Sequence, residues 1–216
     1  ARAAQGHVGR ARGLATDEAT RRRRADILNL PDRLVDLASC LVAADEIASA
    51  ATAAANAEMD VRDADERDSL LESYGVEGAA KVKAERAARP ALKELEQRQK
   101  SRRTRAVRDR LDQSLIDLMS LYRDVLVIQV ANDGVDLINE EIRPTVLKLA
   151  HGSTATKTRV RMDAIERARR QFESACPCQK HPCTKTATFA LRNTKSARLF
   201  ISGIGLESIA YRSPDL

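Results

Sequence analysis

The stretch Leu111-Asp-Gln-Ser-Leu-Ile-Asp-Leu-Met-Ser-Leu-Tyr-Arg-Asp-Val125 repeats an apolar residue every three or four positions. That spacing places the repeated side chains on one side of an α-helix, and it predicts an amphipathic helix that packs against others. We expect this helix to cover residues 91–130, starting after Pro90 and stopping at Asn132-Asp-Gly134. The stripe consists of Leu111, Leu115, Leu118, Tyr122 and Val125.

A second apolar stripe, rich first in Leu and then in Ala, begins at Ile27 and predicts another long helix that ends near Tyr74. Residues 75–90 show no clear stripe, and we expect a loop or a short helical turn there. Shorter helices are predicted at residues 135–142, 144–150 and 156–173. Strands and helices do not alternate in this pattern, so the fold class is predicted to be an all-α helical bundle.

The composition agrees with close helix packing and excludes several classes of protein. Of the 216 residues, 43% are hydrophobic and only 3% are aromatic, and there is no Trp. Four Cys are too few for a disulfide scaffold, and we expect a reducing, cytoplasmic location. No run of about 18 apolar residues is present in the sequence, so no membrane partner is expected.

The composition changes abruptly after residue 175. Residues 176–216 hold three of the four Cys but only two of the 31 acidic residues, and we expect an irregular tail. The run Cys176-Pro-Cys178-Gln-Lys-His181-Pro-Cys183 is interpreted either as a set of zinc ligands or as an incidental thiol-rich tail, and no metal site is assigned. The chain begins at Ala1 rather than at Met, which we interpret as a sign that it is a fragment.

The net charge of +6 is distributed unevenly along the chain. Residues 1–24 carry a net +5 and residues 176–216 a net +4, so residues 25–175 carry −3. The run of four Arg at 21–24 is expected to be a solvated helix face. Because the bulk of the predicted bundle is mildly acidic, any contact with a polyanion has to be local.

The most basic local segment is Arg98-Gln-Lys-Ser-Arg-Arg-Thr-Arg-Ala-Val-Arg-Asp-Arg110, with seven positive charges and one negative. Two interpretations stay open: a solvated helix surface, or a contact with a polyanion or a partner along the helix. The segment has no aromatic residue, which disfavours stacking on the bases of single strands. The residues predicted for such a contact are Arg98, Lys100, Arg102, Arg103, Arg105 and Arg108.

No motif in the sequence points to catalysis. The Gly-rich phosphate loop of nucleotide hydrolases, the G-x-S-x-G elbow and the H-E-x-x-H zinc motif are all missing. The acidic residues between 60 and 68 alternate with Arg and are expected on a polar helix face, whereas Cys40 is expected in the core. We therefore expect no enzyme activity from the chain by itself and no cofactor bound to it.

Three stretches resemble the delta-prime subunit of the bacterial DNA polymerase III clamp loader, in its actinobacterial type. They are Gly6-His-Val-Gly-Arg-Ala-Arg12, Ala91-Leu-Lys-Glu-Leu-Glu-Gln-Arg-Gln-Lys-Ser-Arg-Arg-Thr-Arg-Ala106 and Leu118-Met-Ser-Leu-Tyr-Arg-Asp-Val-Leu126. The likeness covers roughly residues 1–175, and the first stretch alone is a weak signal. From Cys176 onward the sequence departs from the family, whose members continue with another apolar helix.

The resemblance implies that residues 1–24 end the lid domain of an AAA+ protein and that residues 25–175 form a helical collar. It places Gly6, Gly9 and Arg10 in a region like sensor 2, and it makes the stripe on 111–125 a surface that packs against neighbouring subunits. The implied function is assembly with the other clamp-loader subunits of the DNA polymerase III holoenzyme. The complex, which binds the ATP, would load the sliding clamp onto primed DNA during replication. The alternative is a stand-alone helical nucleic-acid-binding protein that uses residues 98–110.

Overall fold

The computed structural model describes residues 2–34, 36–74, 81–131 and 135–174, and these residues form helices joined by short connections, with no strand among them. The all-α prediction is therefore confirmed. The tail beyond residue 174, with its Cys and His residues, lies outside the described residues.

Three short helices begin the chain after the 3-10 turn η1 (Arg2–Ala4): α1 (Val8–Thr16), α2 (Glu18–Leu28) and α3 (Leu30–Arg33). Asp17 separates α1 from α2, because its carboxylate accepts hydrogen bonds from the backbone N–H groups of Ala19 and Thr20 at 3.0 and 3.2 Å. The lid boundary predicted at residue 24 falls inside α2, so the two predicted domains share one continuous helix.

Helix α4 (Leu37–Ser73) forms most of the helix predicted from Ile27 to Tyr74. The prediction of one unbroken helix is wrong, because α2 ends at Leu28 and α3 ends at Arg33. Asp36 starts α4 as a capping box: its carboxylate accepts from Ser39 N at 2.7 Å, and its own N–H donates to Ser39 Oγ at 3.0 Å. The apolar stripe runs on across the break, so its periodicity did not reveal it.

Helix α5 (Lys81–Val130) has 50 residues and is about 75 Å long. The predicted start at Ala91 and the predicted loop over residues 81–90 are wrong, since the helix contains Pro90, whereas residues 75–80 of that loop lie outside the described residues. Proline inside a helix removes one hydrogen bond and costs about 3 kcal/mol. On both sides of it, Ala88 and Leu95 are buried, and packing of this kind outweighs local propensity.

The end of the described chain forms η3 (Glu140–Ile142), α6 (Arg143–His151) and α7 (Ala155–Ser174). The helices predicted at 144–150 and 156–173 are confirmed, but the one at 135–142 is wrong apart from the 3-10 turn. The Asp124 carboxylate of α5 holds this segment instead, because it accepts from Ile138 N at 3.1 Å and from Asn139 N and Nδ2 at 2.7 and 2.9 Å.

The core lies around the C-terminal half of α5. One cluster joins Leu111, Leu115, Leu118 and Tyr122 of α5 to small residues of α4 such as Cys40 and Ala44, and to Ile165 of α7. A second cluster joins Leu121 and Val125 to Leu28, Leu137, Val146 and Ala150. The prediction of Cys40 as a small core residue is confirmed, and burial raises the pKa of its thiol.

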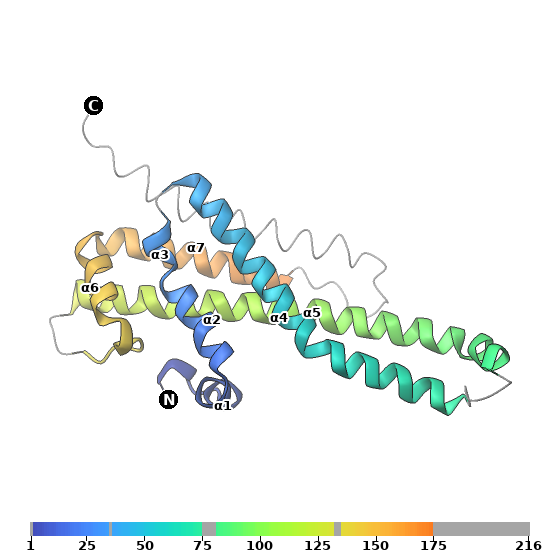
Figure 1. Cartoon of the computed structure of the whole chain (residues 1–216). Helices are drawn as coiled ribbons and strands as arrows, with labels where there is room; N and C mark the ends of the chain where they lie inside the picture. The colour runs from blue at the N-terminus through green and yellow to red at the C-terminus, as the bar shows by residue number, and fades with distance from the viewer. Residues whose placement is uncertain (1, 35, 75–80, 132–134, 175–216) are drawn as a thin grey trace.

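Figure 1 shows two parts of the molecule along α5. Around its C-terminal half, α2, α6, α7 and the start of α4 form the body, whereas the end of α4 and the start of α5 run on together beyond it. We call the projecting part the outer hairpin and define it as residues 58–73 of α4 and 81–103 of α5.

Candidate functional site

The basic segment 98–110 lies on α5 where that helix faces the acidic part of α4, and ion pairs join the two. Arg102 donates through Nη1 and Nη2 to the two oxygens of Glu66, at 2.8 and 2.7 Å, and Nη2 also donates to Asp63. Arg103 donates through Nε to Asp63 and through Nη1 to Asp60, both at 2.6 Å. These ion pairs of Arg102 and Arg103 with Asp60, Asp63 and Glu66 join two helices of the same chain, and we call this contact the seam.

The same seam continues toward the body and toward the tip. Arg110 donates to Glu58, and Gln99 donates through Nε2 to the backbone oxygen of Asp63 at 2.9 Å. Nearer the tip, Arg67 Nη1 lies 3.5 Å from Glu96 Oε1, so the direction of the pair is reversed there. Ion pairs are therefore the main interactions that hold α4 and α5 together in the outer hairpin.

Burial differs strongly among the acids of the seam. The side chain of Asp63 is only 6% exposed and accepts from two guanidiniums, whereas Glu66 is partly open. The hydrogen bonds of Arg102 lower the pKa of Glu66 to about 2, and those from Arg62 and Gln99 act in the same direction. The same pairing raises the pKa of Arg102 further above its ordinary value. Both groups are therefore charged at neutral pH.

The other predicted cations of the segment do not gather on one surface. Arg98 Nε lies 4.0 Å from Glu94 Oε1, and Arg108 Nη2 lies 3.6 Å from Asp109 Oδ1. Seven residues separate Arg98 from Arg105, which puts them on one face, but Lys100 is two residues from Arg98 and points to nearly the opposite side. The six cations predicted as one contact thus belong to three sides of α5.

The predicted sensor-2-like region forms the turn between η1 and α1. Gly6 has φ of +82°, a conformation that favours glycine, whereas Gly9 lies within the first turn of α1. His7 caps that helix, because its Nδ1 accepts from the backbone N–H of Arg10 at 3.2 Å. Gly6 therefore shapes the turn before α1, and Arg10 is the one of the three whose side chain reaches into the protein.

Arg10 is buried beside Asp117 of α5. Its guanidinium donates to the Asp117 carboxylate and, at 2.7 Å, to the side-chain oxygen of Gln113 when that amide is turned toward it. Arg24 of α2 approaches the same carboxylate from the other side, with Nε 3.3 Å from Oδ1, and it also donates to Asn139 and Glu141. We call Arg10, Arg24 and Asp117 the buried triad.

Burial dominates the electrostatics of the triad. It raises the pKa of the Asp117 carboxyl, and the two guanidiniums oppose this rise. Burial and the neighbouring Arg24 likewise lower the pKa of Arg10, against the attraction of Asp117. All three side chains are 11% exposed or less. The expectation that the whole 21–24 run lies in water is thus wrong for Arg24, although Arg21 and Arg22 pair with Glu18 at the surface.

A cavity of about 610 Å³ lies next to the triad, between the N-terminal helices and the α4–α5 pair. Aliphatic side chains such as Ile27, Leu30 and Ile47 line it together with many polar and charged ones, among them the buried Arg10, Arg24 and Asp117. Sequence patterns did not predict this arrangement, because Arg10 and Asp117 are 107 positions apart. The available signal was a carboxylate inside an apolar run, at Asp117 between Leu115 and Leu118.

The stripe predicted as a subunit-packing surface is buried in this chain's own core. Its members are 6% exposed or less, and α2, α4, α6 and α7 cover them. The prediction of an intersubunit surface is therefore wrong for this set: the stripe holds one chain together. The residues concerned are Leu111, Leu115, Leu118, Tyr122 and Val125.

Within the described ranges, no group of three or more His, Cys, Asp or Glu is placed to hold a metal ion. The predicted cluster of Cys176, Cys178, His181 and Cys183 lies outside those ranges. One helix of the described part, Ala38–Ser73, is long and apolar enough by composition to cross a membrane, with a mean hydropathy of 1.2 in its best window. Only 33% of that window is buried, and its small residues Cys40, Ala43 and Ala44 are among those that pack in the core.

Comparisons of the chain with protein-family models, with curated proteins and with solved structures found no match.

Proposed function

We propose that this chain is an assembly module of a bacterial clamp loader, of the delta-prime type that its sequence resembles. The observation that carries the proposal is the contact between one resembling stretch and the residue that directly precedes another. Arg10, from the stretch 6–12, is buried against Asp117, which directly precedes the stretch 118–126. Segments far apart in the sequence that share a family likeness thus meet in one folded unit, as parts of one ancestral domain would.

The chemistry of the described side chains fits assembly better than catalysis. Arg10 is engaged by Asp117 and Gln113, so we assign it no contact with a nucleotide. The polar groups of the core hold helices and loops, as Asp124 holds Asn139. In this proposal ATP, the sliding clamp and primed DNA are handled by the complex, and this chain contributes a helical scaffold.

Co-purification tests the proposal. The 216-residue chain, and in parallel the chain lengthened by the coding sequence that flanks it, is co-expressed with the other clamp-loader subunits of the same genome. We expect at least the longer form to elute with those subunits in size-exclusion chromatography and to support clamp loading. If both forms are folded by circular dichroism yet elute alone, the proposal fails.

The alternative function, nucleic-acid binding through the whole segment 98–110, is disfavoured by the geometry. Arg102, Arg103 and Arg110 already neutralise acids of α4, and their release would leave Asp63 buried without a partner.

A further inference from the structure

Five cations in the described outer part of α5 have exposed side chains: Arg98, which lies near Glu94, and a set of four that consists of Arg86, Arg89, Lys93 and Lys100. None of the four side chains in this set makes an ion pair or hydrogen bond with the part of the chain that the structure describes. They differ in this from Arg102 and Arg103, which are held by α4. Only Lys100 belongs to the segment that sequence analysis singled out.

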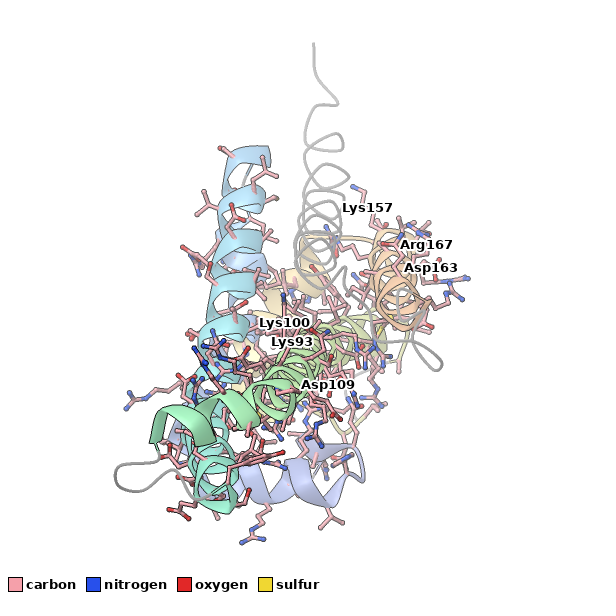
Figure 2. All side chains as sticks on the ribbon, turned by 90° about the vertical axis from the view of Figure 1, so that its right-hand side faces the viewer. Lys93, Lys100, Asp109, Lys157, Asp163 and Arg167 are labelled. Atoms are coloured by element: carbon pink, nitrogen blue, oxygen red, sulfur yellow. The ribbon has the colours of Figure 1, made fainter. Side chains whose placement is uncertain are left out.

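The four residues share one face of α5. Their spacings of three, four and seven residues keep them within about 60° around the helix axis, and they span about 21 Å along it. Figure 2 shows Lys93 and Lys100 on the same side of α5, away from Asp109. We call this set the basic face.

Among the α5 side chains that the structure describes, Glu96 is the acid nearest to the basic face. Glu96 lies at its edge and is paired with Arg67 of α4 at 3.5 Å. The opposite side of α5 is mixed in sign, since Asp109 accompanies Arg98 there. The ion pairs of the seam thus have two effects. They join α5 to α4, and they engage acids such as Asp63 and Glu96, which are then not available to pair with the cations of the basic face.

We propose that the basic face of the outer hairpin binds the phosphate backbone of a nucleic-acid duplex. A duplex carries a phosphate about every 3.4 Å on each strand, so about six phosphates of one strand lie along the 21 Å of the face. Lys and Arg side chains on long stems reach such a backbone without reading bases. No aromatic residue occurs between positions 86 and 121, so stacking on single-stranded bases has no platform.

A duplex fits the face better than a membrane does. Binding at a lipid surface needs apolar side chains next to the cations. The large hydrophobic residues of the described chain that are exposed include Val61 and Tyr74 of the α4 side, but none on α5 between 86 and 103. The basic face is therefore an electrostatic surface without an apolar anchor.

The salt dependence of binding tests the proposal on the 216-residue chain alone, so the result does not depend on clamp-loader assembly. The probe is a labelled DNA duplex of about 24 base pairs, measured by fluorescence anisotropy between 50 and 200 mM salt. Each phosphate contact contributes about −0.9 to the slope of log K against log salt. The double variants Lys93→Gln/Lys100→Gln and Arg86→Gln/Arg89→Gln are each expected to reduce that slope by about 1.8.

With four phosphate contacts, the affinity of the unaltered chain is expected to fall about 150-fold from 50 to 200 mM salt. With two contacts left, the affinity of either double variant is expected to fall only about 12-fold. The matched control is Arg98→Gln/Arg105→Gln, which removes the same charge from another face of the same helix and is expected to leave the slope unchanged. All the substituted side chains are exposed, and circular dichroism checks that each variant is folded.

Three results would overturn the proposal. The control could lower the slope as much as the basic-face variants, which would make binding a matter of net charge. The chain could bind single strands and not the duplex. It could also ignore the duplex and bind anionic phospholipid vesicles or poly-glutamate, which would assign the face to a membrane or an acidic protein.

Discussion

At Asp117 one carboxylate meets two guanidiniums inside the protein, and the balance of charge there is unusual. Arg10 and Arg24 reach it from two different helices, and Glu141 shares the charge of Arg24 from the rim. A buried ion pair adds little net stability, but loss of one partner leaves the other charge uncompensated. Loss of the Asp117 carboxylate therefore affects two buried cations at once, Arg10 and Arg24.

We expect Asp117→Asn to lower the free energy of unfolding by about 3 kcal/mol, because Arg10 then stays buried without a counter-ion and Arg24 keeps only Glu141 at the rim. Urea unfolding followed by circular dichroism measures the change. Asp109→Asn, at an exposed position of the same helix, is the control and should leave the unfolding free energy within error. Equal effects of the two substitutions would contradict the role of the triad.

The acid limb of stability is expected to depend on Glu66. Its pKa is about 2 in the folded chain, below the ordinary 4.5, so the unfolded chain takes up the proton first as the pH falls. The stability that this carboxylate contributes is complete above pH 4.5 and is lost as the pH falls toward 2. Unfolding curves across that range should show a shallower acid loss in Glu66→Gln. An unchanged acid limb in that variant would be evidence against the pairing with Arg102.

At the scale of elements, the seam between α4 and α5 replaces an apolar core in the outer hairpin. The buried residues among its described side chains are Asp63, Ala88 and Leu95, which contribute little apolar area compared with the body. Ion pairs between α4 and α5 hold the two helices together along the rest of their contact, from Glu58 with Arg110 to Arg67 with Glu96.

We expect Arg102→Ala to lower the melting temperature, whereas Arg105→Ala leaves it unchanged. Arg102 bridges Asp63 and Glu66 of α4, but Arg105 is exposed and its side chain meets no partner in the described part of the chain. Thermal unfolding followed by circular dichroism compares the two. A common decrease would mean that general charge, rather than the seam, stabilises the outer hairpin.

Pro90→Ala is expected to stabilise the chain. Proline in a helix interior is less favourable than alanine by about 3 kcal/mol, and Pro90 is exposed, so its ring contributes no core packing that would be lost. Denaturant unfolding measures the gain. A loss of stability would show that the ring is needed where it is.

Sequence patterns located the elements whose signals are local. The helices α6 and α7 follow from Pro144, from their apolar spacing and from the Gly152 stop, and they formed as predicted. The start of α5 was missed because Pro90 is a strong local signal that packing overrides, and the break before α4 was missed because the stripe crosses it. Asp117 and the basic face depend on which helices are neighbours, and one sequence does not carry that information.

At the scale of the whole molecule, the body and the outer hairpin are held by different forces. The body has two apolar clusters, whereas the outer hairpin relies on exposed or half-exposed ion pairs that salt screens. Local opening is easiest where few apolar contacts are buried.

Hydrogen exchange is therefore expected to be faster in residues 58–73 and 86–103 than in residues 111–125. The difference should grow at high salt, because screening weakens the seam but not the apolar clusters. Exchange followed by mass spectrometry on peptides of these three ranges checks both statements. Uniform protection along α5 would contradict the division into two parts.

Because α5 runs unbroken from the outer hairpin into the body, a rigid tilt of this helix about Asp117 would be magnified at its outer end. Lys93 is 24 residues from Asp117, about 36 Å along the helix, so a tilt of about 5° at the body moves Lys93 by about 3 Å. Conversely, a force applied to the outer end of α5 would act on the contacts that Asp117 makes with Arg10 and Arg24. A molecule that binds the outer hairpin and tilts α5 would therefore change the packing of α1 and α2 against it.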